Sequence, residues 1–199
     1  MIIYLHGFNS TPASNKAGIL RRYLAERGLE HHFVCPQLDH WPDHAIATVE
    51  AVMARASTPV TLVGSSLGGF YASTLAERHG VCAVLLNPAV HAQRDLRAAL
   101  GPQRNLYSDE AYEFTEEHLA QLDRMYALRV TPERYLLIVE TGDEILDYRE
   151  AVLHYRSARQ IVVEGGDHSL ASYPRHLPVI VEFAGLSASD TVSGRTLRV

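Results

Sequence analysis

The chain has 199 residues and a mass of 22.1 kDa, a length that predicts one domain with a hydrophobic core of its own. The formal net charge of −5 argues against a nucleic-acid-binding protein, and two cysteines, Cys35 and Cys82, are too few for a disulfide framework or a four-ligand zinc site. No apolar run approaches the roughly 18 residues of a membrane span, and the first residues lack the basic stretch of a signal peptide. We therefore expect a soluble, cytoplasmic protein.

The first half of the chain alternates between expected strands and expected helices. Residues 2–5 form a continuous apolar run, which is typical of a parallel strand covered on both faces, and further strands are expected at 32–35, in the β-branched run at 59–63, and at 81–86. Helices are expected at residues 14–28, where Ser14 is a plausible N-cap and Gly28 a stop, at 43–56, and at 67–79, which Gly80 follows.

A polar, charged segment at residues 89–133 interrupts this alternation, and we interpret it as an insertion that forms a small helical cap, with one helix at 116–126. Tyr107, Tyr112 and Phe114 could line an apolar pocket there or simply pack. Strands follow at 134–139 and 160–163, and helices at 148–155 and 176–183. The pattern predicts an α/β fold over residues 1–186, with a mostly parallel sheet between helices on both faces and a flexible C-terminal tail at 187–199.

The motif Gly64-Ser65-Ser66-Leu67-Gly68 lies directly between an expected strand and an expected helix. It fits the G-x-S-x-G pattern of a nucleophile elbow, and the sharp turn explains why Gly64 and Gly68 carry no side chain. Ser66 is therefore the expected nucleophile. Ser65 is the competing candidate, but it lacks the flanking glycine spacing.

A serine nucleophile needs a base and a carboxylate that orients it. His168 is the expected base because it follows the last strand, where two preceding glycines allow the chain to turn toward Ser66. Asp143 is the expected carboxylate because it lies just beyond the strand at 134–139. Asp147 is the first alternative and Glu144 the second. The order serine, aspartate, histidine is that of the α/β-hydrolases.

Acyl transfer also needs donors for the oxyanion, and we expect the backbone amides of Phe8 and Leu67 in this role. His6 is expected to fix the loop that carries Phe8. His40 and His44 lie four residues apart but flank Pro42, which argues against a shared helix face and hence against a metal site. We expect neither a metal ion nor an organic cofactor, since no nucleotide-binding glycine pattern occurs.

Several motifs together resemble the YqiA-type esterase family of bacteria. They are residues 4–10 with Lys16, Pro36-Gln37-Leu38, residues 64–69, Asn87-Pro88-Ala89, residues 141–148 and residues 165–169. The resemblance covers residues 1–186 and implies a small α/β-hydrolase that cleaves acyl esters or acyl-CoA thioesters. By position, the family's serine, acid and histidine fall on Ser66, Asp143 and His168. Substrate preference does not carry over, because residues 89–133 correspond to the family's most variable part.

The sequence thus predicts a serine esterase that acts on a small-molecule acyl ester or acyl-CoA through an acyl-enzyme. Two alternatives stay open at this point. One is a thioesterase or amide hydrolase with the same three residues, and the other is a non-catalytic binding protein with a hydrolase fold. The sequence predicts neither the acyl chain length nor the oligomeric state.

Overall fold

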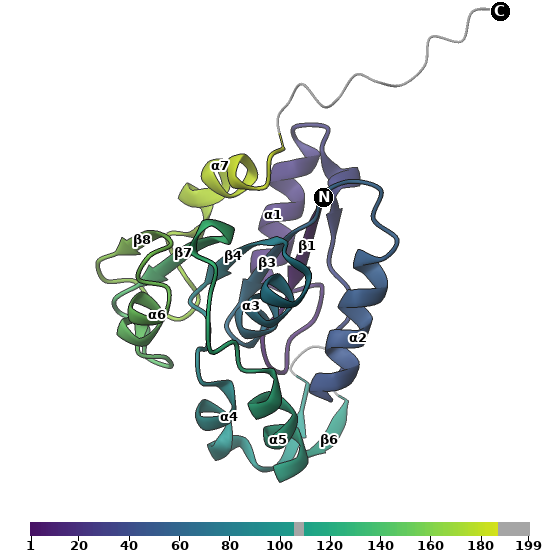
Figure 1. The fold of residues 1–199 in the computed structure, drawn as a ribbon, viewed down its shortest axis with the longest axis vertical. Helices are drawn as coiled ribbons and strands as arrows, with labels where there is room; N and C mark the ends of the chain where they lie inside the picture. The colour runs from purple at the N-terminus through teal and green to yellow at the C-terminus, as the bar shows by residue number, and fades with distance from the viewer. Residues whose placement is uncertain (106–109, 187–199) are drawn as a thin grey trace, which may run out of the picture.

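The computed structural model describes residues 1–105 and 110–186, so Tyr107 and the expected tail at 187–199 lie outside the described residues. Six parallel strands form the main sheet in the order β2-β1-β3-β4-β7-β8 (Figure 1). They are β1 (Ile2–Leu5), β2 (Phe33–Val34), β3 (Thr61–Ser65), β4 (Cys82–Leu86), β7 (Tyr135–Glu140) and β8 (Arg159–Val163). The expected parallel sheet is confirmed, although the strand expected at 32–35 is reduced to two residues.

Helices cover both faces of this sheet. They are α1 (Asn15–Ala25), α2 (Pro42–Met53), α3 (Leu67–His79), α6 (Tyr148–His154) and α7 (Tyr173–Phe183), with short 3-10 turns η1 (Glu30–His32) and η3 (Pro132–Arg134). Residues of β1 show the layering, because Ile2 and Tyr4 pack with α1 and α7, whereas Ile3 and Leu5 pack with α2 and α3. The double cover explains why the strands are continuous apolar runs.

One helix start and one expected N-cap differ from expectation in an informative way. Helix α7 begins at Tyr173, three residues before the expected start, because Pro174 fits the first turn, where no amide is needed. Ser14 does precede α1, but its side chain makes no capping hydrogen bond. No helix in residues 1–105 and 110–186 is long and apolar enough to span a bilayer.

The segment between β4 and β7 lies beside the carboxyl ends of the strands (Figure 1). It contains the helices α4 (Ala92–Asp95), η2 (Arg97–Ala99) and α5 (Glu116–Met125), of which α5 was expected. It also holds a two-stranded antiparallel sheet of β5 (Gly101–Arg104) and β6 (Ala111–Phe114), which the sequence did not predict. We call the segment from α4 to α5 the cap.

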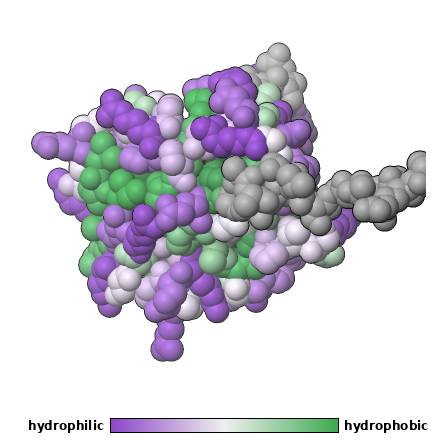
Figure 2. All heavy atoms as spheres, turned by 90° about the horizontal axis from the view of Figure 1, so that it is seen from above, coloured by the Kyte–Doolittle hydropathy of each residue, from purple (hydrophilic) through white to green (hydrophobic). Residues whose placement is uncertain are grey.

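The opposite end of the sheet carries the N-terminus and α7. Viewed from that end, the surface is mostly hydrophilic, with a hydrophobic area on the side where β8 lies (Figure 2). The carboxyl ends of the strands, where α/β sheets place their active residues, lie at the other end, beside the cap.

Candidate active site

Ser66 is the single residue between β3 and α3, and its backbone is strained. Its φ of 55° lies in the left-handed region, which a serine adopts at a cost and which lifts its side chain out of the turn. A Cβ on Gly64 would strike the backbone of Gly68, and a Cβ on Gly68 would strike the carbonyl of Leu5. The turn can therefore form only with glycine at both positions.

The structure brings Ser66, His168 and Asp143 into one hydrogen-bonded chain. His168 Nε2 lies 3.2 Å from Ser66 Oγ, and His168 Nδ1 lies 2.9 Å from Asp143 Oδ2 and 3.0 Å from Oδ1. An ionised carboxylate can only accept, so Nδ1 carries the proton and donates it to Asp143. This leaves Nε2 free to accept the hydroxyl proton of Ser66.

Asp143 has the environment of a permanently ionised group. Its burial alone would raise its pKa, but hydrogen bonds from His168 and from the amides of Leu146 and Ile145 outweigh burial and hold the pKa below the ordinary value. Its side chain is 2% exposed, against 22% for that of His168. The carboxylate is thus shielded from water while the imidazole reaches the surface.

The competing residues lie nearby but make other contacts. Asp147 is the N-cap of α6 and accepts the amide of Arg149 at 3.0 Å. Glu144 accepts the backbone amide of His168 at 2.9 Å, so it holds the histidine's main chain and not its ring. Ser65 is the last residue of β3 and is buried there.

The two residues expected to supply oxyanion donors belong to segments that lie next to the nucleophile. Leu67 is the first residue of α3, where an amide has no acceptor within its own helix. A Cβ built on Gly7 would lie 3.8 Å from Ser66 Oγ, so the loop that continues to Phe8 passes directly beside the nucleophile.

His6 fixes this loop, as expected. Its Nε2 accepts the amide of Leu38 at 3.1 Å, which leaves the ring proton on Nδ1, 3.1 Å from the carbonyl of Gly7. Burial lowers the pKa of His6 despite that second contact, so the ring stays neutral.

Sequence reasoning missed the role of Glu140, the last residue of β7. Its buried carboxylate accepts three backbone amides of the loop that carries His168: Asp167 at 2.8 Å and Ala171 at 3.1 Å on Oε2, and Ser172 at 2.7 Å on Oε1. Burial would raise the pKa of Glu140, but these hydrogen bonds hold it below the ordinary value. We call residues 167–172 the histidine loop.

Asn87 and Lys16 hold the histidine loop from two further directions. Asn87, at the end of β4, accepts the amide of Glu140 at 2.9 Å and donates to the carbonyl of Asp167 at 3.0 Å. Lys16, on α1, donates to the carbonyl of Ser169 at 3.0 Å. Both residues belong to motifs that carry the family resemblance, which was the available signal for them.

A cavity of about 220 Å³ opens next to Ser66, between the loop that follows β1 and the cap. Its lining includes Phe8 and Leu67, and on the cap side Tyr112, which donates to Asn9 at 2.6 Å. Phe114 is not among the residues that line the cavity, and its ring packs edge-on against that of Phe8 with ring centroids 5.3 Å apart. Tyr112 thus lines a pocket, but its neighbours make that pocket largely polar and not apolar.

No group of three or more metal-ligating side chains occurs in the part of the chain that the structure describes. His40 and His44 each lie 3.5 Å from a different oxygen of Asp39 instead. His40 also stacks on Tyr112, with ring centroids 4.3 Å apart.

Comparison with solved structures shows that the fold of this chain is a known one. The alpha/beta hydrolase domain-containing protein 10 from mouse superposes with a TM-score of 0.70 at 17% identity, covering 91% of this chain and 87% of that one. The esterase domain of a Rhodothermus marinus protein gives a TM-score of 0.67 at 16% identity, covering 92% and 85%. At these identities the likeness establishes the α/β-hydrolase fold, as expected.

Sequence comparison gives the family. The model of the "Uncharacterised protein family (UPF0227)" matches residues 1–185. A UPF0227 protein of Vibrio parahaemolyticus is 25% identical over 188 residues, which cover 92% of this chain and 98% of that protein. These matches agree with the resemblance to the YqiA-type family, and the chain therefore belongs to the UPF0227 family.

Proposed function

We propose that this protein is a serine hydrolase that cleaves small carboxylic esters through an acyl-enzyme on Ser66. The observation that carries the proposal is the continuous hydrogen-bonded chain from Ser66 through His168 to the buried Asp143, beside a cavity. A nucleophile, its base and the group that orients the base are thus within reach of one another, which is the geometry that serine catalysis requires.

In the first step, Ser66 Oγ forms a bond to the ester carbonyl carbon while its proton passes to His168 Nε2. The carbonyl oxygen becomes an oxyanion that accepts the amides of Phe8 and Leu67. Asp143 stabilises the positive charge on the imidazole. The carbon–oxygen bond to the alcohol then breaks, and His168 returns the proton to the leaving oxygen.

In the second step, a water molecule gives one proton to His168 Nε2, and its oxygen bonds to the acyl carbon. The bond to Ser66 Oγ breaks, and Ser66 regains the proton from His168. The products are a carboxylic acid and an alcohol, and the enzyme returns to its starting state with no cofactor consumed.

Two observations favour esters over acyl-CoA. The structural neighbour from Rhodothermus marinus is described as an esterase domain. In addition, Glu144 accepts the backbone amide of His168 and Asp167 precedes that residue, so two carboxylates lie beside the histidine, where the leaving group must depart. They outnumber the one lysine that contacts the histidine loop, Lys16, and so favour an uncharged alcohol over the phosphates of CoA.

Hydrolysis of p-nitrophenyl acetate, butyrate and octanoate by the wild-type protein and by Ser66→Ala tests the proposal. We expect kcat to fall by roughly 10³–10⁶ in the variant, as it does when a triad nucleophile is removed. Ser65→Ala is the matched control and should retain most of the activity. Butyryl-CoA and a peptide p-nitroanilide, assayed in parallel, distinguish a thioesterase and an amidase. Turnover that survives in Ser66→Ala would contradict the proposal.

A non-catalytic binding protein would give a different result. It would show no turnover of any of these substrates and no covalent labelling by a fluorophosphonate, although it would be folded.

A further inference from the structure

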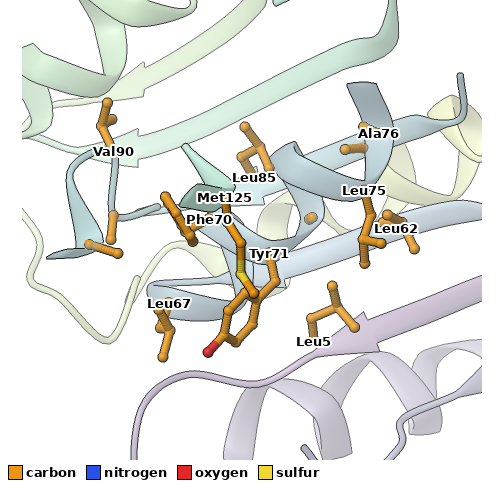
Figure 3. Close-up of a cluster of buried hydrophobic side chains, with 14 of the residues drawn as sticks. Leu5, Leu62, Leu67, Phe70, Tyr71, Leu75, Ala76, Leu85, Val90 and Met125 are labelled. Carbon is orange, nitrogen blue, oxygen red and sulfur yellow. The ribbon is translucent and has the colours of Figure 1, made fainter. Parts of the chain in front are cut away.

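Tyr71 lies one helical turn after Leu67 on α3, so the two side chains share a face of the helix. Tyr71 is only 3% exposed, yet it lines the cavity beside Ser66. Figure 3 shows its ring at the edge of the hydrophobic cluster, with the hydroxyl oxygen on the side of Leu67 and away from Leu62 and Leu75. A deeply buried phenol therefore presents its polar end to the cavity.

The Tyr71 hydroxyl makes no hydrogen bond within residues 1–105 and 110–186. The hydroxyl oxygen is accessible from the cavity, so its proton is available to a molecule that enters there. Burial, together with the nearby Tyr112, Asp39 and Asp43, raises the pKa of Tyr71, so the phenol stays neutral and can donate its proton. A ligand atom that accepts this hydrogen bond would satisfy it.

The position of the cavity indicates which part of a substrate it would hold. His168 must reach the leaving oxygen, so the alcohol lies on the His168 side of Ser66. The cavity lies on the other side, since it is lined by Gly7, Phe8 and Leu67 and not by His168 or Asp143. It is therefore placed to receive the acyl group.

The size and charge of the cavity restrict that acyl group further. At about 220 Å³ it is smaller than the roughly 300–1,000 Å³ of a typical pocket for a drug-sized ligand, which favours a short chain. Its lining includes the carboxylate residues Asp39 and Glu110, which disfavour an acyl group with a second negative charge.

We propose that the cavity is an acyl subsite for short, uncharged hydroxyacyl groups, in which the Tyr71 hydroxyl donates a hydrogen bond to the hydroxyl oxygen of the substrate. The proposal rests on the proposed function, because it assigns the acyl side of the same serine. It makes Tyr71 a specificity-determining residue that takes no part in the proton transfers at Ser66.

Matched pairs of p-nitrophenyl esters test this subsite: 2- or 3-hydroxybutanoyl esters against 2- or 3-methylbutanoyl esters, in which a methyl group replaces the hydroxyl at nearly the same size. We expect the wild-type protein to prefer at least one hydroxy ester over its methyl counterpart in kcat/KM. Tyr71→Phe removes only the hydroxyl, and it should lower kcat/KM for that ester about five- to tenfold, the effect of one hydrogen bond. The methyl ester should be hydrolysed as well as before.

Tyr173→Phe is the matched control. Tyr173 is also a buried tyrosine whose hydroxyl lacks a partner among the described residues, but it lies on α7, against the opposite face of the sheet. Loss of the Tyr173 hydroxyl should leave the preference for the hydroxy ester unchanged.

The outcomes separate this proposal from the proposed function. Turnover that persists in Ser66→Ala refutes the proposed function. Ser66-dependent turnover in which the wild-type protein prefers both methyl esters, or in which Tyr71→Phe leaves the hydroxy-to-methyl ratio unchanged, overturns the subsite alone. The preference of the wild-type protein tests the subsite even if the variant fails to fold.

Discussion

Glu140 should control the activity of His168 without touching the substrate, because its carboxylate holds the histidine loop by three backbone amides. Glu140→Gln keeps the size of the side chain but replaces one acceptor oxygen with an NH2 group. Whichever oxygen is replaced, at least one buried backbone N–H then faces another donor. The loop that carries His168 must shift or lose a hydrogen bond.

The magnitude follows from these contacts. One buried donor without an acceptor costs about 1–3 kcal/mol, and the hydrogen bonds that remain weaken by about 1 kcal/mol each when the acceptor loses its charge. We expect the free energy of unfolding to fall by about 3–5 kcal/mol, which corresponds to a decrease in Tm of roughly 6–20 °C for a chain of this size. A displacement of His168 by about 1 Å would lower kcat up to 100-fold.

Thermal unfolding and ester hydrolysis well below Tm measure the two effects. KM should change little, because Glu140 lies beneath the histidine loop and outside the residues that line the cavity. Glu182→Gln, at an exposed glutamate in α7, is the control and should behave as the wild-type protein. If Glu140→Gln kept the wild-type Tm and kcat, the account of how His168 is held would be wrong.

The pH dependence of stability offers a second test of the same carboxylate. The pKa of Glu140 is lowered in the folded state, so its contribution to the free energy of unfolding is present above about pH 4.3, the ordinary glutamate pKa, and is lost as the pH falls through the lowered value. Urea unfolding between pH 7 and pH 3 should therefore show a shallower acid decline in Glu140→Gln than in the wild-type protein. Equal slopes would mean that Glu140 is not ionised in the folded state.

Three further substitutions give contrasting results. Asp143→Asn should lower kcat about 10⁴-fold in the ester assay, because an amide favours the wrong imidazole tautomer. Asp147→Asn preserves an N-cap and should keep kcat within about twofold. The reverse ranking of the two variants would make Asp147 the acid. Gly68→Ala should yield no folded protein by circular dichroism, since its Cβ would strike the Leu5 carbonyl; a folded, active variant would contradict the elbow geometry. Lys16→Met should lower kcat by less than about tenfold at unchanged KM, because it removes one of several contacts to the histidine loop, and an increase in KM alone would assign Lys16 to substrate binding.

The local features of the site were predictable from the sequence because they arise between neighbouring residues. The elbow at Ser66 is specified by two glycines within two residues of it, and α3 has the predicted bounds, Leu67–His79, because Gly80 ends it in the left-handed conformation. The expected strands followed from apolar runs that only a doubly covered sheet can bury.

The long-range features were not predictable from local patterns. Glu140 appears in the sequence as a strand end, and its partners lie 27 to 32 residues further along the chain. Asn87 contacts Glu140 across 53 residues. Strand β5 contains Gly101 and Pro102, and half of the positions in the β5–β6 pair are exposed, so the pair lacks the apolar run that marks a buried strand. In each case tertiary contacts, and not local preference, determine the result.

The most direct test of the central claim is to locate the residue that a fluorophosphonate modifies. After incubation and proteolysis, mass spectrometry of the peptides should show one adduct per chain, on Ser66, and Asp143→Asn should slow its formation. An adduct on Ser65, or none on the folded wild-type protein, would contradict the assignment of Ser66 as the nucleophile.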